Sequence, residues 1–152
     1  MSRKIDIESA PEKRGSGYPA PFHLSGMGKF RKKLGDAAGL SQFGVNLLVL
    51  EPGAWSAQRH WHTAEDEFVY VLDGEVTLKT NAGDEVLRAG DCAGFKAGEP
   101  DGHCLVNHTD APARVLEVGG RQPERDAVDY PDIDLVIPEG TRKYFHKDGT
   151  PY

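Results

Sequence analysis

The chain has few cysteines, no long apolar run and no excess of positive charge. Only two cysteines occur among its 152 residues, Cys92 and Cys104, which is too few for the disulfide framework of a small secreted domain. We therefore expect free thiols in a reducing cytoplasm, with one bridge between them as the alternative. The net charge of −6 argues against nucleic-acid binding, which needs a basic face.

Membrane insertion and secretion are not expected either. No apolar stretch approaches the roughly 20 residues that a helix needs to cross a bilayer. The first twelve residues are charged throughout and lack the apolar centre of a signal peptide. A chain of 152 residues has the length of one domain, and such a domain buries about 70% of its extended-chain surface. The expectation is one cytoplasmic domain with a core of its own.

Short strands separated by turns fill the middle of the chain. Residues 75–80 alternate, with Val76 and Leu78 on one face and polar side chains on the other, which is typical of a sheet with one buried face. Similar runs predict strands at 45–50, 68–72, 85–88, 92–95, 103–107 and 113–118. With no helix between them, these strands indicate an all-β, antiparallel sandwich or barrel.

The two ends of the chain look different from the middle. Residues 1–42 are predicted to form an irregular N-terminal arm, with one short helical turn at 30–34 that Gly35 ends. Residues 43–119 form the barrel. Residues 120–152 form a C-terminal arm that packs on the barrel or on a partner subunit. These arms and the exposed edges of a barrel lead us to expect a homodimer.

One run of residues carries most of the chemistry. It contains His60 and His62, and Glu67 follows five residues later. Histidines two apart on an extended strand project from the same face. Two neighbouring imidazoles with a carboxylate suit first-row divalent metals. A Pro52-Gly53 turn before the run and an Asp73-Gly74 hairpin after the next strand place it in a sheet.

Two linked motifs resemble those of the cupin superfamily, as found in small single-domain (mono-cupin) metal-binding proteins. The first motif is matched by Gly53, His60, His62, Glu67 and Gly74, and the second by Gly90, Gly98, His103 and Asn107. The chain departs from the pattern at three points. Six residues instead of five separate Gly53 from His60, and four instead of two separate Gly98 from His103. Lys96 stands where the second motif has a proline. The longer loops leave the shape of the pocket mouth open.

The resemblance implies a double-stranded β-helix, or jelly-roll barrel, and a set of metal ligands. Those ligands would be His60, His62, Glu67 and His103, which would bind one divalent ion of iron, manganese, nickel, cobalt or zinc. Glu67 is preferred over Glu65 and Asp66 as the carboxylate because it fits the motif. The other two carboxylates are candidates for orienting a ligand imidazole.

Two further residues are candidates for the pocket. Gln58 would share the ligand side of its strand, with a solvent-exposed position as the alternative. Asn107 would share a face with His103, and a structural hydrogen-bonding role is favoured for it. Neither is assigned a catalytic role, so the catalytic residues stay unassigned.

Three functions fit such a site. The first is a metal-dependent enzyme acting on a small polar metabolite, with sugar-phosphate isomerisation or epimerisation as one activity known in cupins. Its anionic substrate would need cations, for which the loose candidates are Lys96, Arg121, Arg142 and Lys143. The second is an iron-dependent dioxygenase. The third is a non-catalytic metal-containing module that binds a small molecule.

Overall fold

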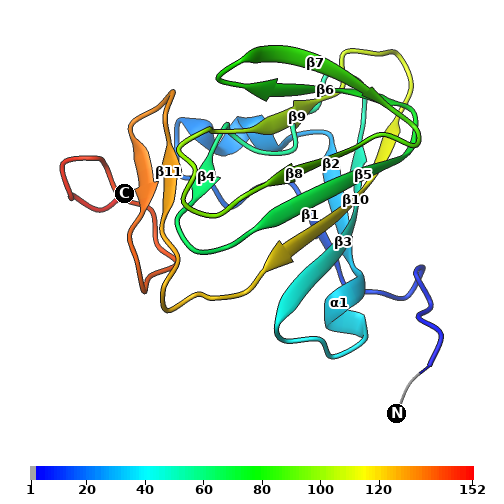
Figure 1. Ribbon diagram of the computed structural model, residues 1–152, viewed down its shortest axis with the longest axis horizontal. Coiled ribbons are helices and arrows are strands. Elements are labelled where there is room, and N and C mark those ends of the chain that lie inside the picture. The colour runs from blue at the N-terminus through cyan, green and yellow to red at the C-terminus, as the bar shows by residue number, and fades with distance from the viewer. Residues whose placement is uncertain (1–2) are drawn as a thin grey trace.

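The structure, a computed structural model, describes residues 3–152, so residues 1 and 2 of the expected N-terminal arm lie outside the described residues. Two sheets face each other across the core (Figure 1). The larger sheet has the strand order β1 (Glu12–Arg14), β2 (Lys29–Lys33), β3 (Phe43–Leu50), β10 (Ala113–Gly120), β5 (Glu67–Asp73) and β8 (Cys92–Phe95). The smaller sheet has the order β7 (Gly83–Arg88), β6 (Glu75–Thr80) and β9 (Cys104–Val106). All strand pairs are antiparallel, as predicted.

The core lies between these sheets and follows from the period-two alternation of their strands. On β5, Val69 and Val71 point inward, whereas Phe68, Tyr70 and Leu72 are exposed. The buried cluster takes side chains from both sheets, namely Leu48, Leu50, Ala54, Val69, Val71, Val76, Leu78, Leu87, Leu105, Ala113 and Val115. The chain is thus nearly all β with a jelly-roll arrangement, as the sequence predicted.

The hairpin predicted at Asp73-Gly74 is wrong, because β5 and β6 belong to different sheets and do not pair. The short connection between them still requires its glycine. Gly74 has a φ of +79°, a conformation that residues with a Cβ rarely adopt. A Cβ at this position would also lie 2.9 Å from the carbonyl oxygen of Pro112. The glycine therefore lets the chain pass from the larger sheet to the smaller one directly after β5.

The N-terminal segment contains more regular structure than expected. The helical turn predicted at 30–34 is wrong, because these residues lie mostly in β2, which pairs with β3 along its whole length. Pairing with a sheet neighbour overrides the weak local preference of the segment. The helix α1 (Leu34–Ala37) begins only where the strand ends, and the 3₁₀ helix η1 (Phe22–Gly26) lies further upstream.

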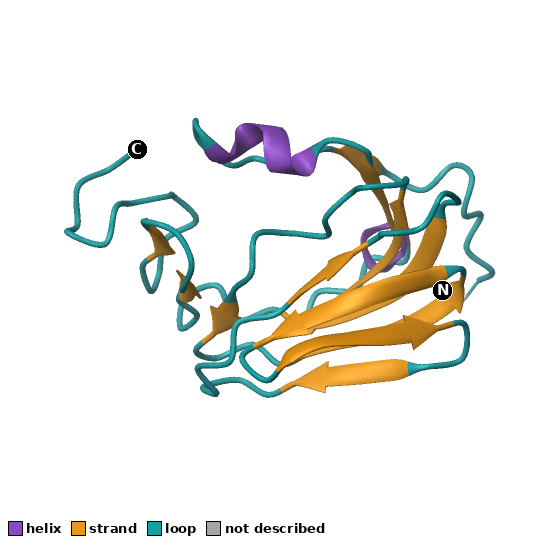
Figure 2. Ribbon diagram, turned by 90° about the horizontal axis from the view of Figure 1, so that it is seen from above, coloured by secondary structure: helices purple, strands orange, loops and turns teal. Residues whose placement is uncertain are grey.

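The C-terminal segment forms a third, small sheet at one end of the molecule. Its order is β12 (Leu135–Ile137), β11 (Val128–Tyr130) and β4 (Trp61–His62). Seen from above, this end lies beside the two larger sheets (Figure 2). A second apolar cluster joins it to the N-terminal segment, because Tyr18 and Phe22 pack against Val128, Tyr130 and Leu135. The two ends of the chain therefore meet next to β4.

The cysteines are free thiols, as predicted. Cys92 is exposed and Cys104 is buried, and burial raises the pKa of the Cys104 thiol to about 12. No helix within residues 3–152 is long and apolar enough to cross a membrane.

Candidate metal centre

The three histidines come together through backbone pairing. His60 directly precedes β4, and His103 directly precedes β9. The two form an antiparallel bridge in which the His60 N–H donates to the His103 carbonyl (3.1 Å) and the His103 N–H donates to the His60 carbonyl (2.9 Å). His62 lies in β4, and Glu67 begins β5. The two sequence motifs are thus joined by direct hydrogen bonds.

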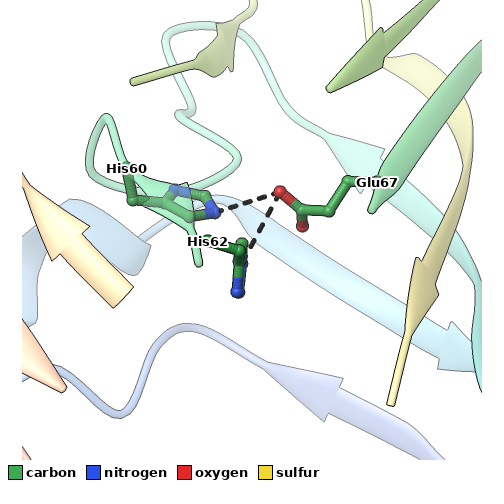
Figure 3. A group of neighbouring side chains, drawn as sticks. All are labelled: His60, His62 and Glu67. Carbon is green, nitrogen blue, oxygen red and sulfur yellow. Dashed lines mark ion pairs between the residues drawn. The ribbon is translucent and has the colours of Figure 1, made fainter. Parts of the chain in front are cut away.

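One carboxylate oxygen lies at the centre of the cluster. Glu67 Oε2 is 3.6 Å from His60 Nε2, 3.6 Å from His62 Nε2 and 2.7 Å from His103 Nε2. Figure 3 shows the carboxylate of Glu67 pointing toward the imidazoles of His60 and His62. The ligand atoms of His60, His62 and Glu67 all lie within 4.8 Å of one another and could hold a metal ion. His103 joins this group through its contact with Glu67.

Hydrogen bonds on the far side of two imidazoles fix their orientation. His60 Nδ1 lies 2.8 Å from the carbonyl oxygen of Gln58, and His62 Nδ1 lies 2.6 Å from Asp126 Oδ2. When Nδ1 of a neutral imidazole donates, Nε2 carries the lone pair. Both lone pairs then face the carboxylate of Glu67.

The buried oxygen at the centre of the cluster is suited to contact with a cation. Glu67 Oε2 is buried, and its contacts do not have hydrogen-bond geometry, so it has no hydrogen-bond partner within residues 3–152. A buried carboxylate oxygen facing imidazole lone pairs is unfavourable unless a cation or protons lie between them. Mixed nitrogen and oxygen donors of this kind fit a first-row divalent ion. The residues present therefore suit a metal ion.

The charges of the cluster depend on one another. Burial raises the pKa of Glu67, but the imidazoles of His103 and His60 together lower it by more. The pKa of Glu67 is therefore well below its ordinary value. Burial lowers the pKa of His60 while Glu67 raises it, with a net upward shift. For His103, burial dominates and the pKa falls. The carboxylate is therefore ionised, as a metal ligand must be.

The other two carboxylates of the run have different tasks. Asp66 Oδ1 accepts the N–H of Ala97 (2.8 Å), and Glu65 Oε1 accepts the N–H of Gln122 (2.6 Å). Glu65 Oε2 approaches His62 Nδ1 only to 4.0 Å. Asp66 and Glu65 thus hydrogen-bond to the backbone of distant segments. Of the three carboxylates, only Glu67 faces the imidazole Nε2 atoms.

The residue that orients His62 was missed in the sequence. Asp126 is only 8% exposed and spans two partners, because its Oδ1 accepts the N–H of Ala64 (2.9 Å) while Oδ2 contacts His62. It lies in the acidic stretch after residue 125, where nothing in the pattern distinguishes it from its neighbours. Asp126, Glu65 and His62 Nδ1 form a second close group, but their existing hydrogen bonds account for it.

A cavity of about 520 Å³ adjoins the cluster. Its wall includes all four candidate ligands and side chains from both ends of the chain, among them Tyr18 and Tyr130. Such a volume is typical of a small-molecule site. A smaller cavity of about 60 Å³ reaches His62, Glu67 and His103 from the side of β8.

The predicted pocket residues do not line either cavity. Gln58 contributes its carbonyl to His60, and its own N–H donates to the Tyr18 hydroxyl (3.1 Å). Residues 56–59 form bends, so strand alternation does not apply to them. Asn107 is fully buried and donates to the carbonyls of Leu50 (2.9 Å) and Ala111 (2.8 Å). It is the structural hydrogen-bonding residue favoured above.

Of the four cations suggested for an anionic substrate, Arg121 and Arg142 line the large cavity. Lys96 lines only the small one. Arg31 and Glu117, which the sequence did not single out, also line the large cavity and form a two-point ion pair.

Known proteins with a similar sequence and fold are found among solved structures. A search of curated sequences gave no match. A cupin sugar phosphate isomerase from Silicibacter pomeroyi is 44% identical, with a TM-score of 0.93 over 99% of this chain and 96% of that one. A protein provisionally assigned as a sugar phosphate isomerase from Acidithiobacillus ferrooxidans is 32% identical, with a TM-score of 0.72 over 82% and 80% of the two chains.

More distant structures share the fold alone. The polyketide cyclase RemF from Streptomyces resistomycificus is 19% identical, with a TM-score of 0.65 over 80% of this chain and 81% of that one.

The family model described as the cupin domain matches residues 46–119. With this match, the two isomerase-like relatives and the jelly-roll arrangement together, the chain belongs to the cupin superfamily.

Proposed function

We propose that this cupin is a metal-dependent enzyme acting on a small polar metabolite, and that its reaction is the isomerisation of a sugar phosphate. The observation that carries the proposal is the buried Glu67 oxygen, which faces imidazole Nε2 atoms at the wall of a 520 Å³ cavity and has no hydrogen-bond partner within residues 3–152. The isomerase named in Silicibacter pomeroyi, 44% identical over nearly the whole chain, supports the reaction type.

His60, His62, Glu67 and His103 would hold the ion, which could be iron, manganese, nickel, cobalt or zinc. When bound, such an ion polarises a carbonyl or hydroxyl oxygen and so acidifies the neighbouring C–H. The chain itself keeps the imidazoles in the required tautomer through the Gln58 carbonyl and the Asp126 carboxylate.

Isomerisation also needs a group that moves a proton between two neighbouring carbons. The carboxylates in the cavity wall are Glu65, Glu67, Glu117 and Asp126. Of these, Glu117 contacts none of the histidines within residues 3–152, and Arg31 holds its two oxygens from Nη2 (2.9 Å) and Nε (2.7 Å). We assign the proton transfer to Glu117.

The test is an assay of metal-loaded protein with a panel of five- and six-carbon sugar phosphates in D₂O and without oxygen. Isomerised product carrying solvent deuterium is expected, and Glu117→Gln should lower kcat about 10²–10⁴-fold with metal content unchanged. Absence of both product and deuterium exchange across the panel would contradict the proposal. A product formed only with oxygen and iron would establish the dioxygenase instead.

A further inference from the structure

The inner face of β2 carries cations where a barrel strand usually carries apolar side chains. Lys29 and Arg31 are two residues apart and share this face. Lys29 is only 4% exposed. Its Nζ donates to the Ser56 carbonyl (2.8 Å), and Arg31 Nη2 donates to the same oxygen (3.0 Å). The two basic groups therefore lie side by side.

A third cation faces them from the neighbouring strand. Lys13 on β1 is the register partner of Arg31, and directly opposed residues of an antiparallel pair share a face. Within residues 3–152, Glu117 is the one carboxylate in ion-pair contact with any of these three cations. Burial and the charge of Arg31 lower the pKa of Lys29 to about 7. Lys13, Arg31 and Glu117 line the cavity, so positive charge exceeds negative charge at this wall even when Lys29 is neutral.

Several of the donors around the cavity have no protein partner. Lys13 and Arg142 both line it, and neither side chain has an ion pair or hydrogen bond in the described part of the chain. Arg31 Nη1 likewise has no acceptor there, since its bonds use Nε and Nη2. Arg121 differs, because Asp36 and the Leu40 carbonyl hold it.

Apart from Glu117, no carboxylate of the cavity wall pairs with these donors within residues 3–152. Glu65 accepts a backbone N–H, Asp126 contacts His62, and Glu67 faces the imidazoles. A carboxylate ligand would bring one negative charge, whereas a phosphate monoester brings 1.5 to 2 charges near pH 7 and three acceptor oxygens. The number and type of the free donors match the phosphate better.

We propose that Lys13, Arg31 and Arg142 form an anion subsite that binds the phosphate group of the ligand in the cavity of the metal centre. The inference rests on the proposed function for its substrate class, and it adds the residues that recognise the phosphate. Lys13 comes from the N-terminal segment and Arg142 from the C-terminal one, so both ends of the chain contribute to substrate selection.

Binding to metal-free protein tests the subsite separately from the metal. After chelation, inorganic phosphate, glucose 6-phosphate and glucose are titrated into the full chain by calorimetry. Lys13→Gln and Arg142→Gln should each weaken binding of both phosphates about tenfold. Arg14→Gln and Lys143→Gln remove the same charge from neighbouring positions outside the cavity wall. These two control variants should leave the affinity for both phosphates unchanged. Equal affinities in all four variants, or no phosphate binding to the chelated wild type, would overturn the proposal.

The outcome separates this inference from the isomerase proposal. If phosphate binding depends on Lys13 and Arg142 but no sugar phosphate is isomerised by metal-loaded protein, the subsite stands and the reaction is wrong. If isomerisation occurs and both variants keep the wild-type kcat/KM for the phosphorylated substrate, the reaction stands and the subsite is wrong.

Discussion

Replacing Asp126 with asparagine tests how the C-terminal segment supports the metal centre. The substitution keeps the shape of a side chain that is 8% exposed, but it removes the charge 2.6 Å from His62 Nδ1. The amide oxygen can still accept the N–H of Ala64, as Asp126 Oδ1 does (2.9 Å). In that orientation the NH₂ group faces His62 Nδ1 and favours the tautomer with the proton on Nε2. The lone pair needed by a metal ion is then lost.

The expected loss in metal affinity is about 10–100-fold, the usual effect of removing a group that orients a ligand, or about 1.4–2.7 kcal/mol. Calorimetric titration of Zn²⁺ or Mn²⁺ into chelated protein measures it directly. Asp129→Asn is the matched control, because Asp129 lies on β11 opposite Trp61 and away from His62. If Asp126→Asn and the control bind the ion equally well, the orienting role is refuted.

Three other predictions concern stability and assembly. Asn107→Ala should cost about 2–4 kcal/mol of unfolding free energy, because buried carbonyls lose their donor, and metal affinity should not change; loss of metal binding without loss of stability would contradict this. Lys29 has a folded-state pKa of about 7, below that of the unfolded chain, so the unfolded state binds more protons above pH 7. Wild-type stability relative to Lys29→Met should therefore rise with pH above 7, by at most about 1.4 kcal/mol per unit, and urea titrations showing a falling difference would refute it. The homodimer stays a prediction, with the exposed Phe68, Tyr70 and Leu72 of β5 as an apolar strip for contact, and sedimentation of a monomer at micromolar concentration would contradict it.

The barrel strands could be predicted because their signals are local. Alternation in 75–80 and the glycine at position 74 set strand and turn, and the structure has both there. Strand β2 could not be predicted in this way. Its inward face carries cationic side chains, so the sequence shows no apolar alternation there. Their partners, the Ser56 carbonyl and Glu117, come from distant parts of the chain.

In the candidate site, too, residues close in sequence could be predicted and residues joined by distant strand pairing could not. His60, His62 and Glu67 are close in sequence, so a local pattern was enough to bring them together. Asp126 is 64 residues from His62 and contacts it only because β11 pairs with β4. A single sequence holds no signal for that pairing. Gln58 was placed in the pocket by an alternation rule that its bent backbone does not obey.

The metal content of untagged protein is the most direct test of the central proposal, that His60, His62, Glu67 and His103 bind one divalent ion. Elemental analysis after reconstitution and desalting should give about one first-row metal ion per chain in the wild type and almost none in Glu67→Gln. Wild-type protein that stays free of metal, or a Glu67→Gln variant that retains a full equivalent, would contradict it.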